Sequence, residues 1–190
     1  QNLALGDLLI TSLNLNLNTD PSVTAVIAVR NMAALTQQFQ LTVTLLTGPV
    51  GAPTTLTGGS VAGGVTDNNG NGATLSTVAG SALYTARIDG AAYQTLFADP
   101  TTLTVVDPFD SADLTPPGAF GTPIPSQPRP GVLGSIGIRY DFNLTSQDAA
   151  SFTGVFVVEP IPEPGTAALL GLGLRGLALL GRRPALHGAL

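Results

Sequence analysis

Phe39-Gln40-Leu41-Thr42-Val43-Thr44-Leu45-Leu46 alternates apolar and polar side chains along nearly its whole length. Because successive side chains of a β-strand point to opposite faces, this alternation predicts a strand. Leu13-Asn14-Leu15-Asn16-Leu17-Asn18 repeats the pattern more strictly, and it predicts a strand whose leucine face is buried. Asparagine is a poor strand former, so the prediction at 13–18 depends on the pattern and not on propensity.

Other strands are expected where apolar or β-branched residues run between turns rich in glycine and proline. They are residues 23–29, 54–57, 60–65, 74–78, 82–88, 101–106, 132–144 and 151–158. Gly58-Gly59 is expected to separate two of them, and Gly154 is a candidate point for a register slip. Asp89-Gly90 is typical of a hairpin turn. Residues 31–36 and 91–97 are ambiguous between helical and extended structure.

Within residues 132–144, four large side chains are expected to share one face of a strand: Ile136, Ile138, Tyr140 and Phe142. Many short strands and almost no helical periodicity before residue 160 predict an all-β fold. The expected architecture is an antiparallel β-sandwich of the jelly-roll kind over residues 1–159, followed by a tail over residues 160–190 with an apolar helix.

Residues 107–130 form the longest stretch without a strand pattern, and they contain seven prolines. Proline cannot donate a backbone hydrogen bond to a neighbouring strand, so this density of proline excludes a sheet interior. The stretch therefore predicts a long polyproline-like loop that lies on the domain or reaches a neighbour.

Charged side chains make up only 10% of the chain, mean hydropathy is +0.35, and all seven basic residues are arginine. A solvated monomer normally carries more charge, so the surface is expected to be neutral and polar, covered by copies of the same chain, or both. Before residue 161 there are four arginines against eleven acidic residues. This acidic balance excludes a basic face of the kind that nucleic acids require.

Residues 160–190 combine a Pro162-Glu163-Pro164 elbow, an apolar run over residues 167–181, and the pair Arg182-Arg183. Leucine and alanine predict a helix from Ala167. At about 1.5 Å per residue the run spans about 23 Å, which is shorter than a hydrocarbon core of about 30 Å. Arg175 lies in its middle, where a charge costs on the order of 3 kcal/mol in a bilayer. These features disfavour a simple membrane anchor.

The order of these three parts resembles the PEP-CTERM sorting signal of exported bacterial proteins. The resemblance covers residues 160–190, and it implies that Pro162, Glu163, Pro164, Arg182 and Arg183 are the sorting motif. It also implies export, transient retention in the inner membrane and recognition by an exosortase. The implied destination is the cell surface or extracellular matrix of a Gram-negative bacterium, with a signal peptide removed ahead of Gln1.

Two groups of oxygen-bearing side chains are candidates for calcium binding. Asp67, Asn69 and Asn71 fit the opening of a calcium loop, but the twelfth position is Val78 and supplies no acidic ligand. A plain turn is the competing interpretation. The other group, spaced by three residues, consists of Asp107, Asp110 and Asp113. Solvated loop acids or turn caps are the competing interpretation there, and no cofactor is required.

The sequence offers little for catalysis. It has no cysteine, and its single histidine, His187, lies beyond the sorting-like motif. A Ser-His-Asp relay in the body is therefore excluded, and a pair of carboxylates for glycoside hydrolysis remains open only in principle. Three tyrosines could stack on sugars or could belong to the core: Tyr84, Tyr93 and Tyr140.

We therefore expect a non-enzymatic structural protein that forms a homo-oligomer or filament. Strands such as residues 13–17 would pair across subunits by edge addition. The tail would be buried between subunits through its leucines and Arg175, and the residues assigned to this role are Leu169, Leu170, Leu172, Leu174, Arg175, Leu177, Leu179 and Leu180. The alternative is a calcium- or carbohydrate-binding surface module, with exopolysaccharide as its partner.

Overall fold

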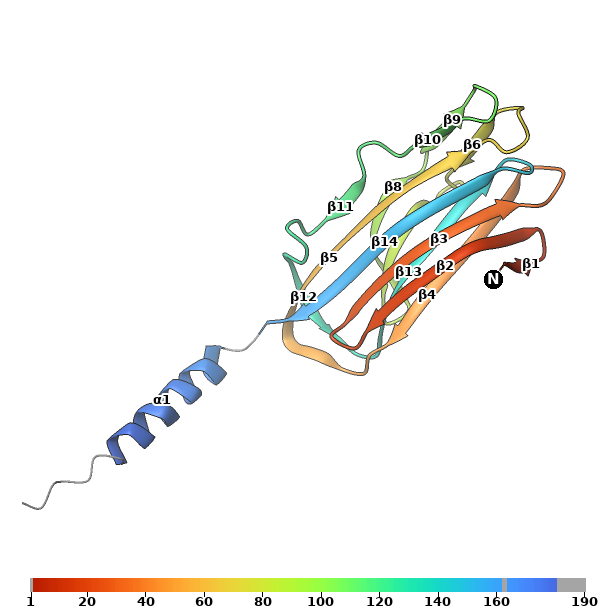
Figure 1. Ribbon diagram of the computed structural model, residues 1–190. Coiled ribbons are helices and arrows are strands. Elements are labelled where there is room, and N and C mark those ends of the chain that lie inside the picture. The colour runs from red at the N-terminus through yellow and green to blue at the C-terminus, as the bar shows by residue number, and fades with distance from the viewer. Residues whose placement is uncertain (1, 162–163, 181–190) are drawn as a thin grey trace, which may run out of the picture. The chain divides into compact units, whose positions relative to one another are not determined.

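Two antiparallel sheets pack face to face across one apolar core in the computed structural model, which describes residues 2–161 and 164–180 (Figure 1). The β unit ends at Pro160, and a second unit begins at Ile161. The all-β sandwich predicted from the alternating stretches is confirmed.

One sheet is built around β14 (Ala149–Pro160) and is called the β14 sheet. β14 pairs with β3 (Ser22–Asn31) on one side and with β5 (Val50–Thr66) on the other. Beyond β3 come β2 (Leu8–Asn18) and β1 (Leu3–Leu5). The outer edge of β5 pairs in succession with β10 (Ser111–Asp113), β11 (Gly118–Phe120) and β12 (Gln127–Val132).

The other sheet is built around β13 (Ser135–Leu144) and is called the β13 sheet. On one side β13 pairs along its whole length with β4 (Gln37–Leu46). On the other side it pairs with β7 (Ala82–Ile88), which leads to β8 (Ala91–Ala98), and with β6 (Ala73–Ser76), which leads to β9 (Thr102–Val105). The ambiguous residues 91–97 are thus a strand, whereas residues 33–35 bend without forming a helix.

The core lies between β13 and β14. Ile136, Ile138, Tyr140 and Phe142 are all buried on the face of β13 that the alternation predicts. Phe152 of β14 packs against two of these rings, with centroids 5.1 Å from Tyr140 and 5.0 Å from Phe142. Burying each such side chain contributes about 1.5–3 kcal/mol, so this contact is a main source of stability.

The glycine of β14 has a packing role. Gly154 stays in register with both neighbouring strands, so the predicted slip is wrong. A Cβ atom at this position would lie 2.1 Å from the hydroxyl oxygen of Tyr140. Gly154 therefore makes room for a buried tyrosine of the opposite sheet.

The predicted break at Gly58-Gly59 is also wrong, because both glycines lie inside the continuous strand β5. A Cβ atom on Gly59 would lie 2.7 Å from the ring of Phe120 in β11. Because these glycines lack side chains, the segment that contains β11 can approach β5 closely. The residue preferences within residues 54–65 cannot reveal such a contact with a segment distant in sequence.

The proline-rich stretch is more regular than predicted. Residues 107–130 contribute β10, β11 and most of β12, all on the outer edge of β5, so the prediction of a loop without strands is wrong. Pro128 lies within β12. An outermost strand needs hydrogen bonds on one side only, so proline is tolerated there, and the exclusion of proline from the sheet interior holds.

Strand β2 exists as predicted, but its leucine face is not buried. Thr11 is an extra residue in the register with β3, and this bulge places Leu8, Ile10 and the following odd-numbered leucines on one face. Leu8 and Ile10 are buried, whereas Leu13, Leu15 and Leu17 are 49%, 39% and 42% exposed. The alternation identified which side chains share a face but not whether anything covers that face.

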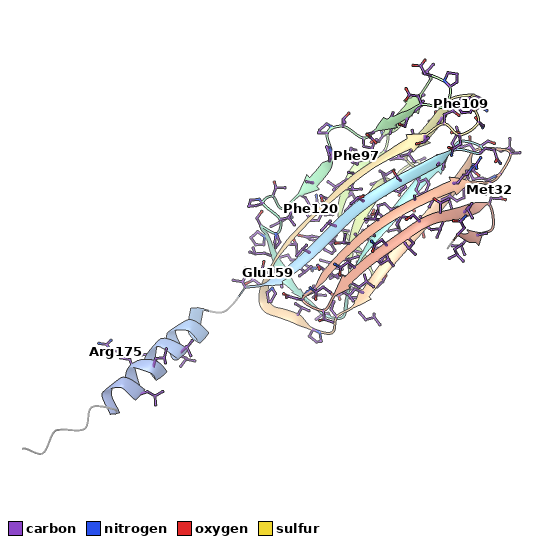
Figure 2. All side chains as sticks on the ribbon, in the orientation of Figure 1. Met32, Phe97, Phe109, Phe120, Glu159 and Arg175 are labelled. Atoms are coloured by element: carbon purple, nitrogen blue, oxygen red, sulfur yellow. The ribbon has the colours of Figure 1, made fainter. Side chains whose placement is uncertain are left out.

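The second unit contains α1 (Pro164–Leu180), the helix expected from the leucine-rich tail. Among the described residues, no helix combines the length and apolar character needed to cross a membrane. Side chains project from α1 on several sides, Arg175 among them (Figure 2). The helix contains no acidic residue that could pair with this arginine.

Candidate functional site

The loop between β5 and β6 is organised around the carboxylate of Asp67, which is buried. Its Oδ1 accepts hydrogen bonds from the backbone N–H groups of Asn69 (3.1 Å) and Gly70 (2.9 Å). Its Oδ2 accepts from Gly72 (3.1 Å) and from Phe109 (3.0 Å), a residue distant in sequence. Burial alone would raise the pKa of Asp67, but these four donors outweigh it and lower the pKa to about 2.

This geometry is that of a turn held by a carboxylate. Asn69 Oδ1 accepts from the Asn71 N–H group, and Asn69 Nδ2 donates to the Ser146 carbonyl. Both oxygens of Asp67 already accept hydrogen bonds, so binding a cation there would require these bonds to break. The turn that competed with the calcium loop is the arrangement found, and the calcium site at Asp67, Asn69 and Asn71 stays a prediction.

Asp148 lies beside this turn and is fully buried. It accepts hydrogen bonds from the Asn68 N–H group and the Thr145 hydroxyl, and it faces Asp67. Burial raises the pKa of Asp148, and the negative charge of Asp67 adds to this effect. The pair joins the β5–β6 loop to the β13–β14 loop. The sequence pattern around Asp148 gave no signal for it.

The second predicted calcium group does not form one cluster. The Asp110 carboxylate accepts a hydrogen bond from the backbone N–H group of Ser111, and the backbone N–H group of Asp110 donates one to the Asp107 carbonyl. Asp113 lies on β10 and packs closely against Gly64 of β5: a side chain on Gly64 would place its Cβ atom 2.4 Å from the Asp113 Oδ1 atom. In residues 2–161 and 164–180 no three acidic or histidine side chains gather as a metal site would require. Calcium at these aspartates also stays a prediction.

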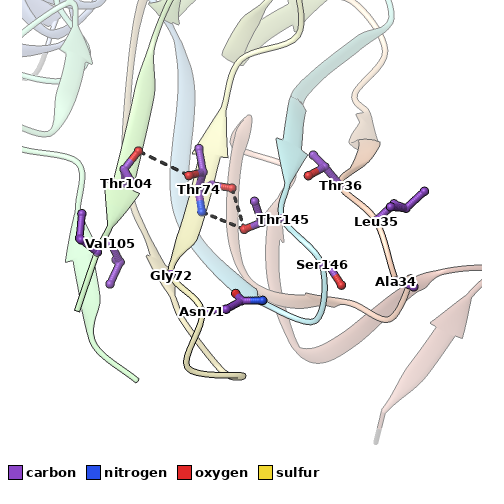
Figure 3. Close-up of a pocket in the computed structure, with 11 residues that line it drawn as sticks. Ala34, Leu35, Thr36, Asn71, Gly72, Thr74, Thr104, Val105, Thr145 and Ser146 are labelled. Carbon is purple, nitrogen blue, oxygen red and sulfur yellow. Dashed lines mark hydrogen bonds between the residues drawn. The ribbon is translucent and has the colours of Figure 1, made fainter. Parts of the chain in front are cut away.

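A pocket of about 570 Å³ opens at the same end of the β unit (Figure 3). Its wall is mostly small and neutral, and includes Ala34, Leu35, Thr36, Asn71, Gly72, Thr74, Thr104, Val105, Val106, Thr145 and Ser146. The Thr145 hydroxyl accepts from the Thr74 N–H group at 2.8 Å, and the Thr74 and Thr104 hydroxyls are 3.5 Å apart. Among the described residues, every side chain that lines the pocket is uncharged, and the polar groups of its wall are hydroxyls and amides.

The tyrosines belong largely to the core. Tyr84 and Tyr140 are fully buried, and burial raises the pKa of both phenols. The ring of Tyr93 is half-buried between Phe120 and Phe156, with the Arg129 guanidinium carbon 5.0 Å from its centroid. The core interpretation therefore describes these residues, and sugar stacking on Tyr84 or Tyr140 is wrong because neither ring is accessible.

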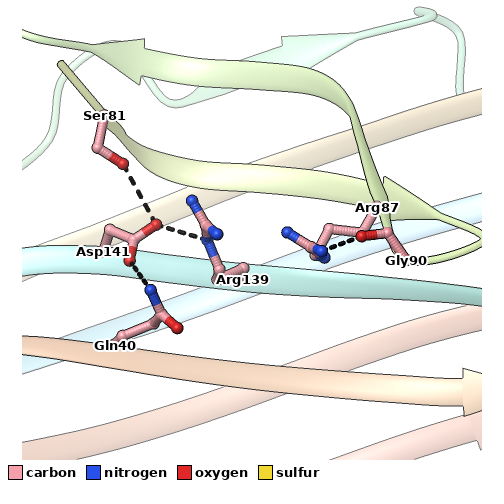
Figure 4. Close-up of polar contacts among 6 residues, drawn as sticks. All are labelled: Gln40, Ser81, Arg87, Gly90, Arg139 and Asp141. Carbon is pink, nitrogen blue, oxygen red and sulfur yellow. Dashed lines mark hydrogen bonds and ion pairs between the residues drawn. The ribbon is translucent and has the colours of Figure 1, made fainter.

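A polar cluster crosses the β13 sheet around Asp141, which is buried (Figure 4). Gln40 donates to its Oδ1 at 2.8 Å, Ser81 donates to its Oδ2 at 3.3 Å, and Arg139 Nε lies 2.6 Å from Oδ2. Nearby, the Arg87 guanidinium donates to the Gly90 carbonyl across the β7–β8 turn. Through Asp141, Gln40 joins β4 to β13 and Ser81 joins the start of β7 to β13, while Arg139 pairs with Asp141 within β13, so we assign the cluster a structural role.

The predicted assembly residues of the tail lie on α1. Leu169, Leu170, Leu172, Leu174 and Leu177 are 61–72% exposed, and Arg175 is exposed as well. Leu179 and Leu180 belong to the helix, but their side chains lie outside what the structure describes. In the sorting motif, Pro164 begins α1, while Pro162, Glu163, Arg182 and Arg183 lie outside the described residues.

In comparisons with known proteins, no protein-family model and no curated protein matches this chain.

Besides the leucines of α1, the structure has an apolar surface at the side of the sandwich where β2 and β4 lie. It is a groove of about 360 Å³ lined almost entirely by apolar side chains and threonines. The alternation in residues 13–18 indicated the strand and its leucine face, but only the fold shows that this face borders a groove.

Proposed function

We propose that the chain is a non-enzymatic structural protein, exported to the cell surface or extracellular matrix, that assembles with copies of itself through its apolar helix. The observation that supports this most directly is the exposure of the five α1 leucines whose side chains are described, each between 61% and 72%. Large apolar side chains gathered in this way usually mark an interaction surface.

The distribution of these leucines around the helix adds to the argument. At 100° per residue, Leu170, Leu174 and Leu177 fall on one side of α1, while Leu169 and Leu172 lie toward others. A helix that is apolar on several sides is normally buried on several sides. A neighbouring helix or sheet from one direction would leave part of this surface in water, so we propose burial among several subunits.

The experiment is a comparison of full-length chains by sedimentation velocity and negative-stain electron microscopy. The variant carries Leu170→Gln, Leu174→Gln and Leu177→Gln, which removes apolar surface from α1 without adding charge. The parent is expected to form multimers or filaments, and the variant is expected to fall to much smaller species.

The matched control is Leu133→Gln, because Leu133 is also strongly exposed but lies on the β unit. The control is expected to assemble as the parent does. A parent chain that stays monomeric at high concentration, or a triple variant that assembles like the parent, would overturn the proposal.

The pocket in Figure 3 supports a second candidate, a module that binds a neutral stretch of exopolysaccharide. The described side chains of its wall are all uncharged, and their hydroxyl and amide groups match the chemistry of sugar hydroxyls. Calorimetric titration with a neutral polysaccharide tests this, with Thr104→Val as the variant expected to weaken binding. Equal heats for parent and variant would contradict it.

A further inference from the structure

The outer edge of β2 has backbone groups without a strand partner over residues 12–18. On its inner side β2 pairs with β3 along its length, but on its outer side β1 covers only Leu8, Leu9 and Ile10. Within the described residues, no strand lies against residues 12–18 on that side. We call this segment the bare edge. A row of unpaired N–H and C=O groups is a template for strand addition.

The bare edge also borders an apolar groove. On this side of the sandwich the β13 sheet ends at β4, and the β14 sheet ends at β2 with the short strand β1 paired to the first residues of β2 (Figure 1). The groove of about 360 Å³ between them is lined by Leu5, Ile10, Leu13, Leu15, Leu17, Ile27, Leu41, Thr42, Val43 and Thr44. An added strand would pair with the backbone of β2 and at the same time cover its half-exposed leucines.

The bare edge lacks the features that normally prevent edge pairing. Between Leu8 and Asn18 there is no proline and no charged side chain, and the bulge at Thr11 lies ahead of the segment. The electrostatics favour a neutral partner, because a charged strand would lose hydration without finding an opposite charge. The chain as a whole has a net charge of −5, yet two bare edges meeting would bring no like charges together.

The sequence of the bare edge is complementary to itself. In an antiparallel pair with a two-fold axis at Leu15, each Leu13 faces the partner's Leu17, and each Asn14 faces the partner's Asn16. Leucines then meet leucines over the groove, and asparagines meet asparagines on the opposite face. A two-fold interface requires a surface that complements itself, and a row of leucines meeting the same row of leucines does so. Directly opposed pairs are the unit of sheet stabilisation.

We propose that two copies of this chain pair through their bare edges, β2 against β2, in the antiparallel register centred on Leu15. The two β14 sheets then form one continuous sheet across the two-fold axis. This inference deepens the proposed function and rests on it for self-association, but it uses a surface other than α1. Pairing of β2 with β2 also fixes the relative orientation of two chains, which contacts of the apolar helix α1 do not.

Cysteine cross-linking tests the register, because the natural chain contains no cysteine. Full-length Leu15→Cys is expected to form a disulfide-linked dimer under mild oxidation, since residue 15 meets itself and opposed Cα atoms in an antiparallel pair are about 4.5–5.5 Å apart. Asn14→Cys alone is expected to remain unlinked. An equimolar mixture of Asn14→Cys and Asn16→Cys is expected to yield the mixed dimer.

Two outcomes would overturn the proposal. One is Leu15→Cys that stays unlinked while its circular dichroism and melting curve match the parent. The other is Asn14→Cys that links to itself as fast as Leu15→Cys does, which would show random collision or another register. A different protein as the natural occupant of the groove would give the first outcome.

A second measurement separates this proposal from assembly through α1. Leu15→Cys is combined with the three leucine-to-glutamine changes in α1, and the cross-link is expected to persist. Adding Asn14→Lys and Asn16→Lys to this chain puts positive charges opposite each other and is expected to weaken dimerisation by about tenfold or more. Thr122→Lys with Ser126→Lys is the matched control, since both residues are exposed and distant in sequence. A control that weakens the dimer equally would contradict the proposal.

Discussion

The β14 sheet ends in two different ways. At β5, a segment rich in proline supplies β10, β11 and β12 in succession, so that this covered edge has a neighbour at most positions. At β2, the bare edge over residues 12–18 has none within the described residues. Of these three strands, β12 contains prolines, which disfavour the addition of a further strand there. The comparison supports our proposal that self-association uses the bare edge and not the covered edge.

The covered edge is also fastened at both ends by carboxylates. Asp67 accepts the Phe109 N–H group ahead of β10, and Asp89 accepts the N–H groups of Leu133, Gly134 and Ser135 after β12. Between these points, Phe120 fills the space above Gly59. The bare edge itself has no titratable side chain, and the nearest ones in sequence are Asp7 and Asp20. The two edges should therefore respond differently to mutation and to acid.

The largest effect is expected from Phe120→Ala, which should turn the covered edge into a second bare one. Phe120 is buried, and its ring centroid lies 6.2 Å from Tyr93 and 6.1 Å from Phe156. Truncating a buried phenylalanine costs about 3–5 kcal/mol, and the loss of this anchor should release β11 from β5. Urea unfolding measures the cost, and light scattering measures new association through β5.

The control for this prediction is Phe109→Ala. Phe109 belongs to the same segment but is 71% exposed, so its replacement should change the unfolding midpoint much less. Figure 2 labels both phenylalanines. Similar midpoints for the two variants would show that Phe120 does not anchor the covered edge.

The next largest effect is expected from Asp67→Asn. Each carboxylate oxygen of Asp67 accepts from two backbone N–H groups. An asparagine keeps one of these oxygens and has an NH₂ group, which cannot accept, in place of the other. Two of the four N–H groups would therefore be left unpaired in a buried site. The melting temperature should fall by several degrees, and hydrogen exchange at residues 108–114 should increase.

Asp110→Asn is the matched control for Asp67→Asn, because Asp110 is exposed and, within the described residues, its carboxylate accepts one hydrogen bond, from the Ser111 N–H group. It should leave the melting temperature nearly unchanged. An equal fall in both variants would mean that the Asp67 turn does not hold the segment.

Particular residues show how far the sequence alone could predict these two edges. The side chains of residues 136–142 were placed correctly, because the local pattern and the final burial agree there. At Leu15 the same pattern was misleading about burial, because cover depends on whether another strand lies opposite. At Gly59 the preference of glycine for turns was overridden by a phenylalanine that is distant in sequence.

The candidate site shows the same limit. The turn at Asp67 follows from its own residues, since aspartate, asparagine and glycine favour such loops. Its partners Phe109 and Asp148 are brought there by the pairing of β10 and β14 with β5. Long-range pairing of this kind leaves no periodic signal in the sequence.

Mild acid should loosen the covered edge before the bare edge. The pKa of Asp67 is about 2 and that of Asp89 is also lowered, since in each case backbone N–H donors outweigh burial. A carboxyl whose pKa is lower in the folded state stabilises the fold above the ordinary value of 3.8, and this contribution is lost as the pH falls from there toward 2. Hydrogen exchange between pH 5 and pH 2.5, corrected for intrinsic rates, should show residues 108–135 losing protection first. Residues 22–31 form β3, the strand that pairs with β2 behind the bare edge. Simultaneous loss of protection there would contradict this order.

The smallest effect is expected from Asp148→Asn, and it has the opposite sign. Burial and the neighbouring Asp67 raise the pKa of Asp148, so its charged form is unfavourable in the folded state. Stability associated with this group is present below pH 3.8 and is lost as the pH rises through the raised pKa of Asp148 in the folded chain.

An uncharged asparagine at position 148 keeps an acceptor for the Asn68 N–H group and removes the repulsion from Asp67. The melting temperature at pH 7 should therefore rise slightly, and the gain over the parent should vanish in acid. A gain that persists unchanged in acid would show that the charge of Asp148 is not its source.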